Sequence, residues 1–125
     1  MTGHVDDSGR ALVSLQLSHP TSSQLLSIEA WIDTGFTGGL VLGAEQIEAL
    51  GLTRLTSVQG ILVGGNIAEF ETYACDVEWF GARKTVEMLS GTSMIALLGV
   101  QLLRDCALTI DYPARAVVLA QSPLM

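Results

Sequence analysis

The stretch Ala30-Trp31-Ile32-Asp33-Thr34-Gly35-Phe36-Thr37-Gly38-Gly39 decides the fold of this chain. Apolar residues alternate along residues 25–32, which predicts a half-buried strand that ends at Asp33. A carboxylate at the end of a rigid strand is expected to face a cleft, where it can react. Gly35 lets the backbone turn sharply at no Cβ cost, and the Thr34 hydroxyl is expected to bond the backbone and lock the turn. The simpler interpretation makes Asp33 only the turn former, with its carboxylate accepting backbone N–H bonds.

Composition defines the class of protein. The chain has 125 residues, of which 49% are hydrophobic and 15% charged, so we expect one ordered globular domain with a real core. Thirteen glycines suit a turn-rich β protein. The net charge is −7, from 6 basic and 13 acidic residues, without a basic cluster. This balance argues against nucleic acid and against an anionic membrane surface as partners.

Targeting and metal-binding signals are missing from the sequence. The longest apolar run, residues 94–100, is far shorter than the roughly 18 residues that span a bilayer. The N-terminus carries Asp6 and Asp7 and has no apolar core typical of a signal peptide. Cys75 and Cys106 lie in apolar segments without a CxxC pattern or a Cys/His cluster, so we expect free thiols and no metal site. We therefore predict a cytoplasmic protein that does not contact a membrane.

Alternating segments predict a closed, mainly β barrel with one or two short helices. Helix is expected only at residues 44–51, where Gly51 follows the last helical turn, and at residues 99–105. Residues 1–9 are polar and are predicted to be a flexible N-terminus, with residues 10–125 forming one domain. The predicted strands cover residues 11–17, 25–32, 40–42, 58–63, 67–73, 73–80, 84–89, 107–111 and 116–120.

A glycine-rich tip joins two of these strands. Residues 58–63 and 67–73 flank Gly64-Gly65-Asn66, which predicts a β-hairpin with a soft tip. The local sequence is equally consistent with an ordinary hairpin and with a flap that folds over a substrate.

The order of motifs along the chain resembles the retropepsin-like aspartic proteases. The active-site loop of that family reads apolar-Asp-Thr-Gly, here Ile32-Asp33-Thr34-Gly35, and its second motif is two hydrophobic residues and a glycine before a short helix, here Leu97-Leu98-Gly99. Strand, Asp-Thr-Gly, helix, glycine-tipped hairpin, Leu-Leu-Gly, helix and final hairpin follow the order of one lobe over residues 10–120. Phe36 makes the loop similar to that of the single-lobe bacterial and archaeal members of clan AA.

The resemblance implies an aspartic endopeptidase that hydrolyses peptide bonds. It implies that Asp33 is catalytic, that Thr34, Gly35 and Phe36 complete the active-site loop, and that no metal or other cofactor is required. One lobe supplies one aspartate, so the resemblance also implies a homodimer acting on a peptide or protein substrate. The flap is then formed by Val63, Gly64, Gly65 and Asn66, and the motif that supports the loop by Leu97, Leu98 and Gly99.

Two matters stay open at the level of sequence. A phenyl ring at Phe36 offers no hydrogen bond, and we expect it to pack under the loop or to narrow the cleft. The alternative function is a non-catalytic dimeric module that binds peptides and retains the protease fold.

Other candidate groups are weaker. The tripeptide Asp7-Ser8-Gly9 follows no apolar strand and is interpreted as an exposed turn. Four further carboxylates, Glu69, Glu71, Asp76 and Glu78, are expected to be solvated along a strand.

Overall fold

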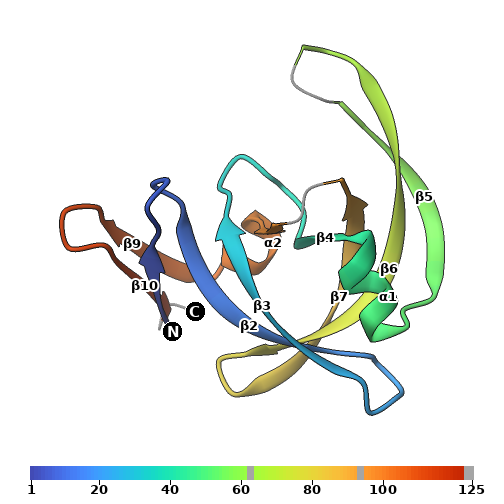
Figure 1. Cartoon of the computed structure of the whole chain (residues 1–125), viewed down its shortest axis with the longest axis horizontal. Helices are drawn as coiled ribbons and strands as arrows, with labels where there is room; N and C mark the ends of the chain where they lie inside the picture. Colours follow the sequence, from blue (N-terminus) through green and yellow to red (C-terminus); the bar gives the residue numbers. More distant parts are fainter. Residues whose placement is uncertain (62–63, 93–94, 123–125) are drawn as a thin grey trace.

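The computed structural model describes residues 1–61, 64–92 and 95–122, most of which lie in strands (Figure 1). Two short helices interrupt them, α1 (Ala44–Leu50) and α2 (Val100–Leu103). The strands are β1 (Thr2–Val5), β2 (Ala11–Ser18), β3 (Leu25–Ile32), β4 (Leu40–Gly43), β5 (Arg54–Ile61), β6 (Ile67–Trp79), β7 (Ala82–Gly91), β8 (Ala96–Leu98), β9 (Cys106–Asp111) and β10 (Ala116–Gln121).

Within the described residues the strands form one sheet in the order β5-β6-β7-β4-β8-β3-β2-β1-β10-β9. An additional pairing of β6 with β2, through Leu17 opposite Val77 and Ser18 opposite Asp76, closes the middle of this sheet on itself. The closed part is a barrel of six strands, β6-β7-β4-β8-β3-β2. The predicted mainly β fold with a closed barrel and short helices is confirmed.

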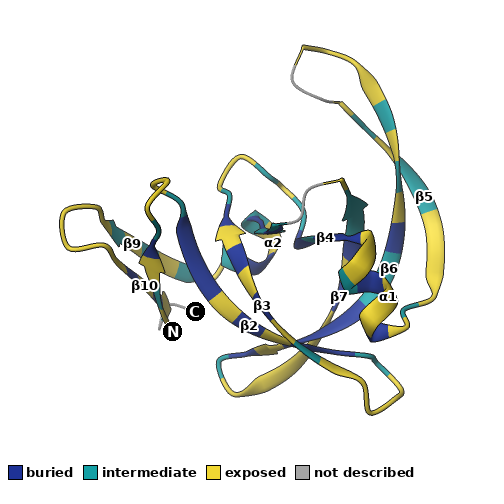
Figure 2. Cartoon of the chain, in the orientation of Figure 1, coloured by how far each residue is buried: buried dark blue, intermediate teal, exposed yellow. Residues whose placement is uncertain are grey.

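Apolar side chains of the barrel strands make the core. On β2 the residues Val13, Leu15 and Leu17 are buried while Ser14 and Gln16 are exposed, the alternation expected of a strand with one face inward. Figure 2 shows the buried residues along β2 and β4, whereas β5 is largely exposed. Each fully buried leucine stabilises such a core by about 2 kcal/mol.

Helix α1 begins and ends where the sequence predicts. The backbone N–H of Gly43 donates to Gln46 Oε1 at 3.0 Å and closes the first turn. Gly51 ends the helix with φ +65°, a left-handed conformation that favours glycine. Ile47 and Leu50 are buried against the sheet, so the short helix is held by packing.

The N-terminus differs from the prediction. Instead of a flexible segment over residues 1–9, Thr2–Val5 form β1, which pairs with β2 on one side and β10 on the other. The charged amino group of Met1 donates to the Leu119 carbonyl oxygen at 2.9 Å. Backbone pairing on both sides and the buried side chain of Val5 order this segment, and a local sequence pattern does not report such pairing.

The turn after β1 is ordered as well. Asp6 Oδ1 accepts the backbone N–H groups of Ser8 and Arg10, and Arg10 Nε donates to Asp6 Oδ2 at 2.7 Å. These hydrogen bonds hold the pKa of Asp6 below its usual value, and the bond from the Arg10 backbone N–H has the largest effect. The predicted exposed turn at Asp7-Ser8-Gly9 is confirmed, with Gly9 at φ +84°.

Strand β6 is a single long strand where the sequence predicted two. Its second part, from Thr72 to Trp79, pairs with β7 in the barrel, and within the described residues its first part pairs only with β5. Between Thr72 and its tip the β5–β6 hairpin is therefore a two-stranded ribbon that leaves the barrel, as its arc in Figure 1 shows.

Candidate active site

Asp33 lies directly after β3, on the loop that joins β3 to β4. Its Oδ1 accepts the backbone N–H of Gly35 at 2.9 Å, and its carbonyl oxygen accepts the backbone N–H of Phe36 at 3.2 Å. Among the described residues Asp33 Oδ2 has no hydrogen-bond partner, and the side chain is half-buried. Asp33 thus forms the turn with one carboxylate oxygen and leaves the other available to a ligand or a water molecule.

Within the described residues the Thr34 hydroxyl does not form the hydrogen bond that was expected to lock the turn. The sequence predicted a bond from this hydroxyl to the backbone across the turn. Thr34 is exposed, and its hydroxyl has no partner in the part of the chain that the structure describes. The Asp33 carboxylate replaces it as the group that satisfies the turn, because it already accepts the Gly35 N–H.

The motif Leu97-Leu98-Gly99 lies against this loop, as the sequence predicts. Strand β8 runs parallel to β3 and antiparallel to β4, so it fills the space between the two ends of the loop. The Asp33 N–H donates to the Leu98 carbonyl oxygen at 2.9 Å, and the Gly99 N–H donates to the Gly39 carbonyl oxygen at 2.8 Å. Both ends of the loop are thereby bonded to β8 and the residue that follows it.

Gly99 allows the loop and the start of α2 to meet without intervening side-chain atoms. A Cβ at Gly99 would overlap the carbonyl oxygen of Gly38 and lie 2.6 Å from that of Phe36. The close approach permits two further bonds, from Val100 N–H to Phe36 O at 2.8 Å and from Gln101 N–H to Gly38 O at 3.1 Å. The backbone N–H groups of the first turn of α2 therefore fix the position of the loop.

The Phe36 ring packs on the same junction. A Cβ at Gly38 would lie 2.5 Å from Phe36 Cζ and 2.9 Å from its Cε1, so the ring occupies the space that a side chain there would need. The ring also lines the cleft described next. The sequence left two roles open for Phe36, packing and narrowing the cleft, and its position serves both.

A cleft of about 880 Å³ extends from the loop to the β5–β6 hairpin. Its floor includes Asp33 and Phe36 from the loop together with half-buried apolar side chains of the barrel. Its opposite wall comes from the hairpin, at Val58, Ile61 and Phe70. The floor side chains from the barrel are Val41, Leu89 and Leu97.

The hairpin has the predicted tip. Gly64 and Gly65 adopt φ +96° and +86°, conformations that L side chains rarely take. Ile61 and Ile67 face each other in register at the end of the ribbon and are 79% and 69% exposed. Asn66 follows the two glycines in this tip, whereas Val63, the fourth residue predicted for the flap, lies outside the described residues.

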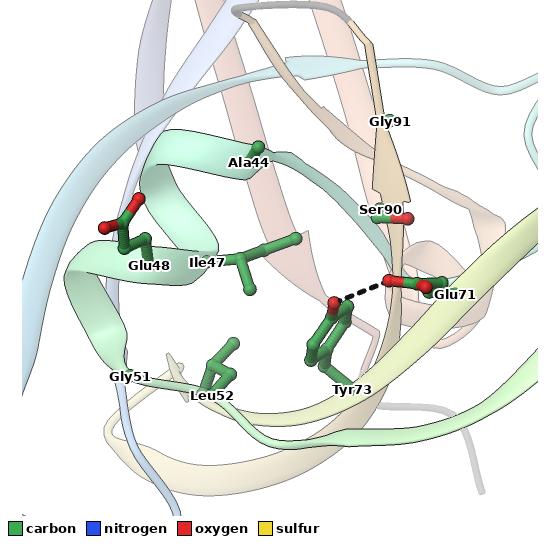
Figure 3. Close-up of a pocket in the computed structure, with 9 residues that line it drawn as sticks. All are labelled: Ala44, Ile47, Glu48, Gly51, Leu52, Glu71, Tyr73, Ser90 and Gly91. Carbon is green, nitrogen blue, oxygen red and sulfur yellow. Dashed lines mark hydrogen bonds between the residues drawn. The ribbon is translucent and has the colours of Figure 1, made fainter.

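A second pocket, of about 520 Å³, lies outside this cleft between α1 and the base of the hairpin (Figure 3). Tyr73 Oη donates to Glu71 Oε2 at 2.9 Å, and Glu71 also pairs with Arg54 Nη1 at 3.5 Å. The hydrogen bond to Glu71 raises the pKa of Tyr73 above its usual value. This pocket shares only Gly91 with the lining of the cleft.

Sequence patterns misplaced one carboxylate and missed another. Asp76 was expected to be solvated, but it is buried and pairs with Arg83 Nε at 2.7 Å and with the Thr85 hydroxyl. Glu87 and Gln101 line the cleft although neither belongs to a motif. The period-two pattern of β7 was the available signal for Glu87, because it places Glu87 on the face of Leu89.

Neither cysteine of the chain lines this cleft. Cys75 and Cys106 are free, and burial raises the pKa of the Cys75 thiol to about 11. In the described part of the chain no three His, Cys, Asp or Glu side chains gather to hold a metal ion. Nor does any described helix have the length and apolar character required to cross a membrane.

Comparison with known proteins identifies the fold. A similar solved structure is a retroviral protease, the EIAV protease complexed with the inhibitor HBY-793, with a TM-score of 0.59. The two sequences are 20% identical, and the alignment covers 80% of this chain and 90% of that chain. The chain therefore has a retropepsin-like fold. No protein-family model and no curated protein sequence matches it.

Proposed function

We propose that this chain is an aspartic endopeptidase of the single-lobe type, which hydrolyses peptide bonds as a homodimer. The observation that carries the proposal is the position of Asp33. Its carboxylate lies at the end of a barrel strand, lines a cleft beneath a two-stranded hairpin, and has one oxygen without a partner in the described chain. The order of motifs along the chain, Asp33-Thr34-Gly35 and Leu97-Leu98-Gly99 among them, resembles that of the retropepsin-like proteases and supports the proposal.

The proposed chemistry needs two carboxylates within hydrogen-bond distance of each other. Two like charges so close cannot both ionise, so the pair shares one proton and titrates as a unit. The ionised member takes a proton from the attacking water. The protonated member donates a hydrogen bond to the scissile carbonyl and protonates its oxygen as the tetrahedral intermediate forms.

A two-fold axis beside the loop would supply the second carboxylate. Among the described residues that line the cleft, the carboxylates are Asp33 on the loop and Glu87 on β7, and an isologous dimer would present the Asp33 loop twice. The exposed Thr34 hydroxyl, which has no partner in the described chain, is then available to bond the partner's loop. The peptide would lie between the paired loops and the two hairpins.

The alternative is a non-catalytic dimeric module that binds peptides in the same cleft. The bond from Gly35 N–H to Asp33 Oδ1 favours it, since a structural turn former would make this bond as well. In that function Asp33 contributes to stability and not to chemistry.

Exchange of Asp33 for Asn distinguishes the two functions. The amide is close in size but cannot take a proton from water, so we expect loss of peptide hydrolysis near pH 5 with little change in melting temperature. The matched control is Asp111→Asn, since Asp111 Oδ1 also accepts a turn amide, from Ala114 at 3.1 Å, but lies outside the cleft. Cleavage is measured with a peptide library, and the dimer is detected by light scattering. Asp33→Asn with unchanged cleavage and reduced stability would falsify the catalytic assignment.

A further inference from the structure

The cleft has an uneven distribution of charge. Among the described residues that line it, the ionisable side chains are Asp33 and Glu87, both acidic. The six basic residues of the chain are all outside this lining. Two carboxylates, in a lining whose described residues include no basic side chain, give this cleft a negative potential, which attracts cationic groups.

Glu87 is placed in the cleft by the register of β7. Its neighbours Val86 and Met88 are buried in the core, so the alternating side chains of Glu87 and Leu89 lie on the opposite face. That face lines the cleft at both residues. The orientation of Glu87 thus follows from the strand and does not depend on a loop.

The Glu87 carboxylate has no ion pair or hydrogen bond within the described chain, and its side chain is exposed. On the neighbouring strand β6, Asp76 pairs with Arg83 and Glu71 with Arg54, while Glu69 and Glu78 lie outside the cleft lining. An unpaired carboxylate between apolar walls is available to a cation from outside.

Further acceptors lie beside this position. The point that a Cβ on Gly39 would occupy is 3.1 Å from Gln101 Oε1 and 3.7 Å from the Glu87 carbonyl oxygen. Besides the Glu87 carboxylate, the cleft lining thus holds the amide oxygen of Gln101 as a second side-chain acceptor. A guanidinium or ammonium group carries several N–H donors, which several acceptors can satisfy at once.

We propose that Glu87 is a specificity-determining residue and that the substrates are peptides with a lysine or arginine beside apolar residues. This inference rests on the proposed peptide-binding function of the cleft. The basic side chain pairs with Glu87 and the apolar neighbours pack on Val41, Leu89 and Leu97. In a two-fold dimer Glu87 occurs twice, so the preferred basic positions lie at equal distances on either side of the scissile bond.

The experiment measures cleavage and binding of a peptide panel in which lysine is replaced, position by position, by norleucine or glutamate. With the parent protein we expect the lysine peptide to have a KM about tenfold lower than its norleucine analogue at two mirrored positions. Added salt should reduce this preference. Glu87→Gln should abolish it, and Glu87→Lys should reverse it in favour of the glutamate peptide. The matched control is Glu78→Gln, which removes an exposed carboxylate of β6 outside the cleft and should leave the preference unchanged.

Binding in the Asp33→Asn background separates this inference from the proposed catalysis. If the parent cleaves no peptide but Asp33→Asn binds the lysine peptide more tightly than the norleucine peptide, and loses this preference with Glu87→Gln, catalysis is wrong and the inference holds. If peptides are cleaved with an Asp33-dependent rate but Glu87→Gln and Glu87→Lys leave the preference unchanged, the inference is overturned and catalysis stands. Absence of binding by every peptide overturns both.

Discussion

The Asp33 loop (residues 33–39) and the β5–β6 hairpin lie on opposite sides of the cleft and are stabilised in opposite ways. The loop is bonded along its length to β8 and α2, through the N–H groups of Asp33, Gly99, Val100 and Gln101. Among the described residues, the part of the hairpin between Thr72 and the tip is paired only within the hairpin, and Ile61 and Ile67 at its end are largely exposed. Hairpins of two strands are marginally stable alone, whereas a loop bonded to two other elements opens with difficulty.

This difference assigns a task to each side of the cleft. Chemistry that needs a carboxylate within a fraction of an ångström of its position requires a fixed loop. Entry of an extended peptide into the cleft requires the other wall to move. The predictions below test whether rigidity and freedom are distributed in this way.

The largest effect is expected from Gly99→Ala. The new Cβ would collide with backbone oxygens of Phe36 and Gly38, which cannot move without breaking the bonds that hold the loop. We expect a loss of about 3 kcal/mol of unfolding free energy and loss of any Asp33-dependent cleavage. Thermal and urea unfolding measure the first, and a peptide assay the second.

The matched substitution on the hairpin is Gly60→Ala. Its Cβ would lie 2.9 Å from Cε2 of Phe70, a side-chain ring that can rotate away. We expect a loss below about 1 kcal/mol. Equal losses for Gly60→Ala and Gly99→Ala would contradict the contrast between the two sides.

Substitutions at the Phe36 ring are expected to reduce stability less than Gly99→Ala does. The three atoms nearest to a Cβ on Gly38 all belong to this ring, so Gly38→Ala alone should strain the loop. Phe36→Ala alone should cost about 2 kcal/mol, because it empties a half-buried site. In the double variant the smaller side chain at residue 36 leaves room for the new methyl group.

A double-mutant cycle measured by urea unfolding checks this contact. We expect a coupling of about 1 kcal/mol, with Gly38→Ala less harmful in the Phe36→Ala background than in the parent. Additive losses would show that the ring does not hold the loop through Gly38. The ring would then act only by narrowing the cleft.

Much of this fold could be predicted because its patterns are local. The strict alternation of residues 25–32 predicted β3 with the bounds that the structure has. Gly51 after a helix-forming run predicted the end of α1. The family resemblance carried by the motifs at Asp33 and Gly99 implied that β8 lies beside the loop, and backbone bonds join the two.

The misplaced residues depend on which strands pair across the molecule. Thr2–Val5 are ordered because β10 and β2 flank them, and Asp76 is buried because Arg83 and Thr85 lie on the neighbouring strand. Glu87 lines the cleft only once β7 is placed beside β4. Pairing over such sequence distances is set by the whole sheet, so a local pattern cannot reveal it.

The smallest effect is expected where the hairpin joins the barrel. Tyr73 Oη donates to Glu71 at this junction, on the exposed rim of the pocket beside α1 (Figure 3). Because exposed pairs are screened by solvent, Tyr73→Phe should lower the unfolding free energy by at most about 0.5 kcal/mol at neutral pH. The bond raises the pKa of Tyr73 in the folded protein, so its contribution is complete below the ordinary tyrosine pKa and is lost as pH rises through the folded value. The stability difference between parent and variant should therefore vanish at strongly alkaline pH, where a phenolate no longer donates and is repelled by Glu71. Urea unfolding at neutral and alkaline pH measures this difference, with the exposed Tyr112→Phe as control.

Hydrogen exchange gives the second measurement: in Tyr73→Phe the hairpin amides should exchange faster, while the amides of Gly99 and Val100 keep the parent's rates. A stability difference that grows with pH, or faster exchange in the loop, would show that the junction does not separate the two regions.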